Sequence, residues 1–426
     1  MNVKEVGAPF LAAADRLGRR LCRDALWAGG RCNWLGWSLV PHGGAWVPAY
    51  RAQTSTLYDG TAGIALFLAR LYQLTRDPVE RATLEGAVRQ VRQAAVERNP
   101  EYRFGFYYGV AGVASMAFQV GNILEDEDLI RWGLDLLTGD GLGEPDGTRL
   151  DLMVGSAGSI PPLLAFAALT GREELLASAL AHGELLLATA DRSERGWSWE
   201  TIPQEGEEHL VGYAHGTAGI ACALLELHRV TGESRFREAA LEALRYERSH
   251  FDPEHGNWPD LRRLPGAPPE GGRRYSVAWC HGAPGIGFSR LRIRRLLDGD
   301  EEVAADCEAA LATTAASVSA PMIPHLGSFC LCHGAGGNAD LLLEASGLLG
   351  RPQLRQTAEA VGQYGIAQYG QADMPWPCGV SGTGETPNLM LGLAGVGYFY
   401  LRLHAPETVP SLLVLQPDVH PLNPGR

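Results

Sequence analysis

The chain has 426 residues, of which 46% are hydrophobic and 20% are charged, and its formal net charge is −13. A chain this acidic is repelled by nucleic acid and by anionic membrane surfaces, so neither is expected as a partner. The sequence also has no run of ~18–20 apolar residues and no signal-peptide pattern, which argues against membrane insertion and favours a cytoplasmic protein.

A tetrapeptide of the form Gly-x-x-Gly, mostly with alanine in its third place, recurs along the whole chain. Its seven copies begin at Gly60, Gly109, Gly155, Gly216, Gly282, Gly334 and Gly392. Successive copies lie between 46 residues (109 to 155) and 66 residues (216 to 282) apart, which indicates a repeated supersecondary unit. Glycine suits such turns because, without a Cβ, it adopts left-handed conformations and lets another backbone approach closely.

Each tetrapeptide opens an apolar run with helical spacing, as in Ile64, Phe67, Leu68 and Leu71. Helices with one polar face are expected in the intervals, at 78–97, 173–190, 233–250 and 301–319. A helix that is apolar nearly all round belongs in the interior, and an amphipathic helix covers it. Seven such pairs that close on themselves predict an all-α fold, an α/α toroid with the glycine turns at one end.

The same repeat predicts the domain organisation. Each unit of a repeat protein packs mainly against its neighbours, so a closed ring can exceed the usual size of one core. Residues 1–426 are therefore predicted to form a single domain. The segment 32–50 is expected to be a small extended piece, and the tail after His404 to pack irregularly.

Two polar intervals rich in proline and glycine, 191–210 and 251–278, interrupt the helical rhythm. Loops of this length inside a compact fold are often functional. They lead into the turns at His215 and Cys280, so they either line the entrance for a flexible substrate or are surface without a special role.

Two strings carry candidate metal ligands immediately before a glycine turn: Trp279-Cys280-His281-Gly282 and Cys332-His333-Gly334. Together Cys280, Cys332 and His333 provide three ligands of the kind that zinc prefers, and a count of three leaves one tetrahedral position open, as in catalytic sites. A free cysteine is more often a small buried hydrophobe. The glycine frame that follows both strings favours the metal site.

These strings and the seven turns resemble the LanC-like lanthionine synthetase cyclases over nearly the whole chain. Three longer strings are similar to the cyclase half of the LanM type: WCHGAPGIG (279–287), LCHGAGGNAD (331–340) and GLAGVGY (392–398). The chain has no room for the large dehydratase half of such synthetases. We therefore expect a free-standing cyclase or an excised domain, and the opening methionine favours the first.

The resemblance implies an α/α toroid with one zinc per chain, held by Cys280, Cys332 and His333. It implies the addition of a peptide cysteine thiolate to dehydroalanine or dehydrobutyrine, which forms a lanthionine or methyllanthionine thioether ring. His215 would be the acid or base of this reaction, and Asp151 would orient it or balance its charge. The implied substrate is a dehydrated precursor peptide, made by a separate dehydratase or kinase/lyase enzyme.

Two neighbouring residues are left out of the implied ligand set. Cys330 could compete as a ligand, because some relatives carry an all-cysteine site, but Cys332-His333 fits the commoner pattern directly. His281 occupies a position that the family fills variably, and it is expected not to bind the metal.

Other interpretations of the sequence remain. His215 and Asp151 taken without the resemblance would be polar residues at helix ends, and the chain could be a non-catalytic peptide-binding scaffold with a structural zinc. A zinc thiol-prenyltransferase also uses a helical toroid, but its ligands do not sit in an adjacent Cys-His before a glycine turn. A toroidal glycosidase needs two facing carboxylates, and no turn supplies an obvious pair.

Overall fold

The computed structural model describes residues 3–42, 45–94, 103–138, 142–203, 208–262, 273–370 and 374–415. The chain divides into two compact units, each built from several separate segments. Unit 1 comprises Met1–Arg98, Ser115–Gly133 and Ala315–Leu412, and unit 2 comprises Asn99–Ala114, Leu134–Thr314 and Leu413–Arg426. Within the described residues, the strands form only three sheets, each of two antiparallel strands.

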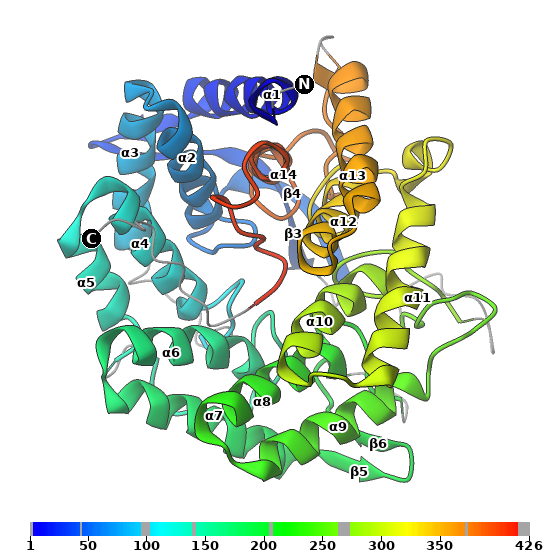
Figure 1. Ribbon diagram of the computed structural model, residues 1–426. Helices are drawn as coiled ribbons and strands as arrows, with labels where there is room; N and C mark the ends of the chain where they lie inside the picture. The colour runs from blue at the N-terminus through cyan, green and yellow to red at the C-terminus, as the bar shows by residue number, and fades with distance from the viewer. Residues whose placement is uncertain are drawn as a thin grey trace. The chain divides into compact units, whose positions relative to one another are not determined.

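Unit 1 joins the beginning of the chain to its end. Its helices are α1 (Val3–Asp24), α2 (Thr61–Thr75), α3 (Pro78–Ala94), most of α4 (Val110–Leu124) and α5 (Glu127–Asp135), the 3₁₀ helix η2 (Ile323–Leu326), α12 (Ala335–Leu349), α13 (Pro352–Gly365), the π-helix η3 (Ile366–Gly370) and α14 (Leu393–His404). α14 packs against both α1 and α2, so elements from the two ends of the chain lie side by side (Figure 1).

Unit 2 is a succession of helix pairs. Its helices are α6 (Ser156–Thr170), α7 (Glu173–Thr189), α8 (Thr217–Thr231), α9 (Ser234–Arg248), α10 (Ala283–Leu296) and most of α11 (Glu301–Ser317). α6 packs on α7 and α8 packs on α9, while α8 also contacts α6 and α10. A short hairpin of β5 (Asp191–Ser193) and β6 (Gly196–Ser198) follows α7.

Seven helices begin on the residue after the first glycine of a Gly-x-x-Gly turn, as the sequence predicts. These glycine-led helices are α2, α4, α6, α8, α10, α12 and α14. They are buried along most of their length; in α8, every residue from Thr217 to Leu227 is buried. The helix that follows each of the first six buries one side only, as α9 does with Phe236, Ala240 and Leu244, whereas α14 packs on α1 from the start of the chain. The predicted pairing of an apolar helix with an amphipathic one is confirmed.

The second glycine of the turn is required by close backbone approach. A Cβ on Gly337 would overlap the carbonyl oxygen of Leu331, and one on Gly395 would overlap the carbonyl oxygen of Leu389. A left-handed backbone, the other expected reason for glycine, occurs at only one of the seven first glycines: Gly282, with a φ of 93°. Close approach rather than left-handed backbone therefore explains most of the repeat.

Three of the four expected amphipathic helices have ends within about two residues of the prediction. The helices expected at 173–190, 233–250 and 301–319 are α7, α9 and α11. The helix expected at 78–97 is α3, which ends at Ala94; residues 95–102 lie outside the described part, as do 204–207 and 263–272 of the two long intervals.

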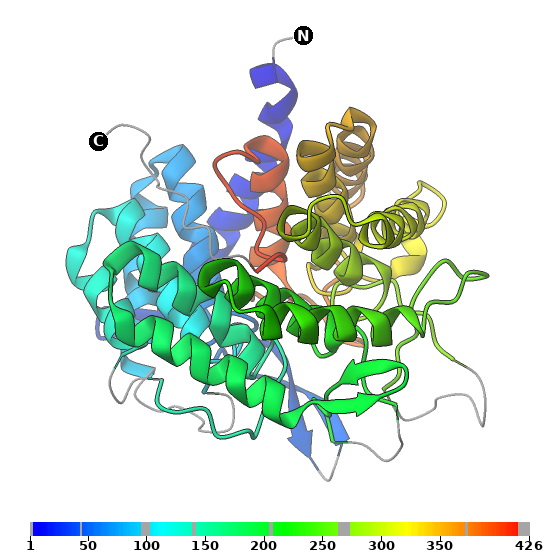
Figure 2. The ribbon, with the colours of Figure 1, turned by 60° about the horizontal axis from the view of Figure 1, so that its bottom comes forward.

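The extended piece expected at 32–50 is present and larger than predicted. A short hairpin of β1 (Leu26–Ala28) and β2 (Arg31–Asn33) is followed by a long one of β3 (Leu35–His42) and β4 (Ala45–Ala52), drawn as blue arrows in Figure 2. Residues 405–415 have no regular structure but bury Val409 and Leu413, which confirms the irregular packing of that part of the tail. Among the described helices, none has the length and apolarity to span a bilayer.

Candidate active site

The loops that precede α10 and α12 carry the candidate metal ligands. Cys280 lies three residues before α10, and Cys332 and His333 lie directly before Gly334, the N-cap of α12. The backbone of each loop is fixed by hydrogen bonds: Ala278 N donates to His281 O at 3.2 Å, and Cys332 N donates to Met390 O at 3.0 Å. A helix N-terminus favours negative charge, so both loops suit thiolates.

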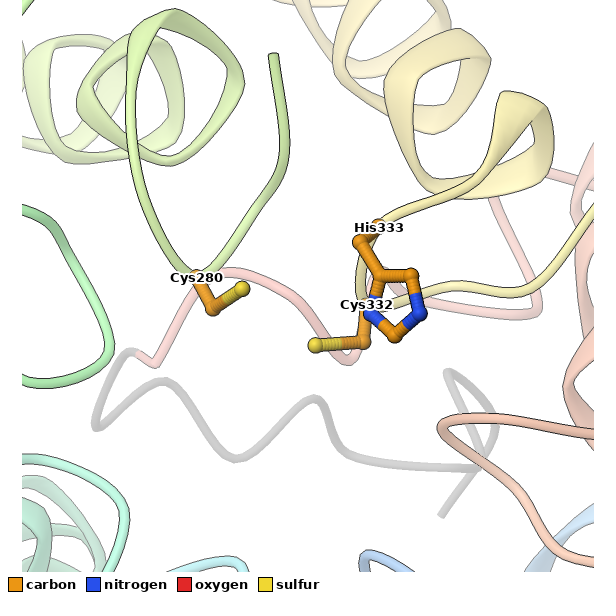
Figure 3. Close-up of side chains that lie close together, drawn as sticks. All are labelled: Cys280, Cys332 and His333. Carbon is orange, nitrogen blue, oxygen red and sulfur yellow. The ribbon is translucent and has the colours of Figure 1, made fainter. Parts of the chain in front are cut away.

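The three candidate ligands lie together. The sulfur atoms of Cys280 and Cys332 and a ring nitrogen of His333 are all within 4.8 Å of one another (Figure 3). Two thiols and an imidazole are a donor set that zinc prefers. The group therefore fits the expected metal, and its role as ligand set remains a prediction.

His333 is held by a backbone acceptor. Its Nε2 lies 2.9 Å from the carbonyl oxygen of Gly379 and donates to it, which leaves Nδ1 as the nitrogen that can bind a metal. Cys330 lies on the same loop and is fully buried, but it is not part of the three-residue group.

His215 and Asp151 form a hydrogen-bonded pair in unit 2. His215 Nδ1 lies 2.7 Å from Asp151 Oδ2, and the exposed fractions of the two side chains are 21% and 1%. The other carboxylate oxygen of Asp151 accepts a hydrogen bond from Val154 N at 2.8 Å, and the hydroxyl of Thr201 donates to the carbonyl oxygen of His215. The carboxylate is thus fixed on both sides, while the imidazole keeps one edge accessible.

The pair lies beside the loop that carries Cys280. Ala214 N donates to Cys280 O at 3.4 Å, and the His215 ring stacks on the ring of His281 with centroids 5.7 Å apart and an angle of 21° between the planes. His215 is therefore next to the Cys280 loop within unit 2, as a role in the same site requires.

Behind His281, Asp260 and Arg262 form an ion pair that no sequence motif singles out. Asp260 Oδ1 is 3.7 Å from His281 Nδ1, and Asp260 accepts two hydrogen bonds from the guanidinium of Arg262, at 2.9 and 2.7 Å. Burial alone would raise the pKa of Asp260, but the hydrogen bonds and the charge of Arg262 hold that pKa well below its usual range. Burial also lowers the pKa of His281 well below its usual value, so this ring is neutral. His281 is not part of the three-residue group, and its expected lack of a metal role stays a prediction.

Sequence reasoning missed three contributors to this region: Asp260, Thr201 and the carbonyl of Gly379. The position of Asp260 inside the interval 251–278, just before a candidate ligand loop, was the one available signal. Thr201 binds the backbone carbonyl of His215, and Gly379 binds His333 through its own backbone carbonyl. A sequence pattern gives no indication of such backbone contacts.

Comparison with known proteins places these observations in a family. The sequence profile described as lanthionine synthetase C-like protein matches residues 51–414. The lacticin 481/lactococcin biosynthesis protein LcnDR2 of Lactococcus lactis subsp. lactis is 23% identical over 365 residues, which are 83% of this chain and 36% of that protein. The chain thus spans about a third of the length of this relative.

Among solved structures, nisin cyclase superposes with a TM-score of 0.58 and 18% sequence identity. The match covers 83% of this chain and 88% of that chain. At this identity the likeness shows the fold alone, and it confirms the predicted all-α toroid.

Proposed function

Because the chain belongs to the lanthionine synthetase C-like family, we propose that it is a zinc-dependent cyclase that forms lanthionine or methyllanthionine rings in a peptide. The observation that carries the proposal is the approach of Cys280, Cys332 and His333 to within 4.8 Å of one another. Cys280, Cys332 and His333 would supply three protein ligands, a number typical of catalytic zinc sites, whereas a structural zinc is normally held by four.

The proposed reaction adds a cysteine thiol of the peptide across the double bond of dehydroalanine or dehydrobutyrine. The thiol loses its proton, a carbon–sulfur bond forms at the β-carbon, and a proton is added at the α-carbon, so no group leaves. When bound, zinc supplies Lewis acidity that lowers the pKa of a coordinated thiol.

We assign the proton transfers to His215. Its Nδ1 is bonded to Asp151, which favours the tautomer with hydrogen on Nδ1 and leaves Nε2 as the working atom. Nε2 accepts the proton of the incoming thiol or delivers one to the α-carbon. The imidazole acts as a base when Nε2 carries no proton and as an acid when it carries one. Asp151 keeps the imidazole in place and offsets the charge that His215 gains, in the manner of a carboxylate–histidine pair.

The substrate is proposed to be a dehydrated precursor peptide, since dehydrated residues must exist before thioether rings can form. A separate dehydratase or kinase/lyase enzyme would supply it. We propose a reducing compartment such as the cytoplasm, since none of the eight cysteines is joined in a disulfide. We also propose that the two units act as one cyclase domain, because each is assembled from alternating segments of the chain.

The proposal is tested with a synthetic peptide that carries one dehydroalanine and one cysteine a few residues away. Ring formation leaves the mass unchanged but removes the free thiol, so mass spectrometry after thiol alkylation counts it. The unmodified protein with zinc should consume the thiol, and the zinc-free protein should not. A protein that binds zinc and the peptide but never removes the thiol would instead be the peptide-binding scaffold.

A further inference from the structure

The segment 374–391, which precedes α14 and is here called the strap, runs alongside the loop that carries Cys332 and His333. We propose that the strap positions His333 for metal binding, through the backbone carbonyl of Gly379. This inference rests on the proposed function, because it assumes that His333 is a ligand. Its basis is the 2.9 Å hydrogen bond from His333 Nε2 to Gly379 O.

The strap also holds the backbone of the ligand loop at two points. Phe329 N donates to Pro377 O at 2.7 Å, and Cys332 N donates to Met390 O at 3.0 Å. The two halves of the strap are joined by Gly379 N, which donates to Leu391 O at 2.7 Å. The backbone on either side of the ligands and the imidazole itself are therefore fixed by one segment.

Gly379 has to be a glycine for this contact to form. A Cβ at this position would lie 2.9 Å from each of three atoms: Cys330 Sγ, His333 Nε2 and Leu391 Cδ2. Carbon approaches these atoms so closely only with strain, so a side chain would push the strap or the imidazole away. The carbonyl reaches His333 because no side chain stands between them.

The strap is anchored at a distance from the ligands. Glu385 pairs with both terminal nitrogens of Arg20 on α1, and the same carboxylate accepts a hydrogen bond from Trp376 N at 2.8 Å. The hydroxyl of Thr386 donates to Trp37 O on β3 at 2.9 Å. These contacts fix the position of the carbonyl before any metal binds.

The consequence for the metal centre follows from the two nitrogens of an imidazole. A histidine ligand normally donates its other ring N–H to a fixed acceptor, which sets its tautomer and its orientation. In His333 the bonded nitrogen is turned away from Cys332, and the other nitrogen faces the Cys332 sulfur (Figure 3). The strap thus presents Nδ1 of His333 in the orientation that coordination needs.

The test compares two glycine substitutions in the strap by zinc affinity, measured in competition with a chromogenic chelator. Gly379→Ala should bind zinc about 10–100-fold more weakly, as is typical when the acceptor behind a histidine ligand is lost. Gly384→Ala is the matched control, because the nearest atom to its Cβ would be Trp37 Nε1 at 3.9 Å, an ordinary contact. It should bind zinc like the unmodified protein.

A spectroscopic readout separates positioning from general damage. The cobalt-substituted Gly379→Ala protein should show shifted or weakened d–d bands, while its metal-free helical content stays that of the unmodified protein. If Gly379→Ala does not fold, Glu385→Ala takes its place, since it removes the anchor on α1 and should also weaken zinc binding.

Unchanged zinc affinity together with an unchanged cobalt spectrum in the folded variant would overturn the role of the strap while leaving the proposed function intact. An unmodified protein that binds no zinc would overturn both. A Cys332→Ala protein that keeps its zinc would remove the proposed ligand set itself.

Discussion

The Nδ1 atom of His215 lies 2.7 Å from the Oδ2 atom of Asp151, although 64 residues separate the two in the chain. Both residues stand in the loops before glycine-led helices: Asp151 lies four residues before Gly155, the N-cap of α6, and His215 lies directly before Gly216, the N-cap of α8. Successive glycine turns therefore bring side chains from different repeats within hydrogen-bond distance. The stack of His215 on His281, which stands before α10, extends this relationship to a third turn.

The zinc content should depend on the three proposed ligands. The purified protein should carry about one zinc per chain, and Cys332→Ala should lose most of it, because two remaining protein ligands hold zinc poorly. Helical content should stay nearly constant, since the described core is formed by helix packing. Elemental analysis and circular dichroism measure the two quantities.

Cys22→Ala is the control for that experiment. Cys22 also belongs to unit 1 and is free, but it stands at the end of α1 and is not part of the three-residue group. It should keep its zinc. Equal metal content in Cys22→Ala and Cys332→Ala would contradict the ligand assignment.

His215→Ala should retain zinc and lose ring formation. A general acid or base contributes about 10²–10⁴-fold to a rate, so the loss should fall in that range in a timed alkylation assay. Asp151→Asn should lose less if the carboxylate only orients the imidazole.

The control for this prediction is His228→Ala, which changes a histidine at the far end of α8 that is bonded to Glu233 O. Its rate should equal that of the unmodified protein. If His215→Ala forms rings at the same rate, the imidazole has no part in the proton transfers.

Acid should destabilise the protein through His182. This residue is fully buried in α7, its two ring nitrogens have no hydrogen-bond partner, and it packs edge-on against Phe104. Burial lowers the pKa of His182 to about 4, slightly offset by Asp146. In the unfolded chain the pKa is about 6.5, so below that pH the unfolded state takes up a proton that the folded state refuses.

The free energy of unfolding should therefore fall as the pH drops from about 6.5 to about 4, by on the order of 3 kcal/mol from this group. His182→Phe places an aromatic ring without a titratable group at this position, so it should reduce the loss of stability in acid. Urea unfolding at pH 7 and pH 4.5, in excess chelator so that zinc release does not contribute, measures the difference. The exposed His325→Phe serves as control and should behave like the unmodified protein. An equal acid loss in both variants would contradict the prediction.

Two glycines of α12 should respond in opposite directions to alanine. In Gly337→Ala the new Cβ overlaps the Leu331 carbonyl oxygen, so the variant should lose about 1–3 kcal/mol or more of stability. At Gly347 no atom lies within 4 Å of the position that a Cβ would take, and Gly347→Ala should gain about 0.5–1 kcal/mol from helix propensity. Thermal unfolding midpoints of the two variants measure the difference. Equal midpoints for Gly337→Ala and Gly347→Ala would contradict the explanation of the turn by close backbone approach.

The sequence alone determined the helices, their glycine turns and the residue types of the candidate metal group. These features are local: a Gly-x-x-Gly turn prescribes its own backbone, and helical periodicity is visible within a dozen residues. The choice of Cys280, Cys332 and His333 followed from the ligand preferences of zinc, while His215 and Asp151 depended on the family resemblance.

The tertiary structure decided which of these residues meet and what supports them. The pairing of Asp151 with His215 and the stack of His215 on His281 join separate glycine turns, whose relative placement no local pattern specifies. The approach of Asp260 to His281 from the interval 251–278 is likewise a result of packing. The support of His333 comes from the carbonyl of Gly379, a backbone group that every residue possesses. Sequence can name a donor or an acceptor side chain, but only packing selects one carbonyl among hundreds.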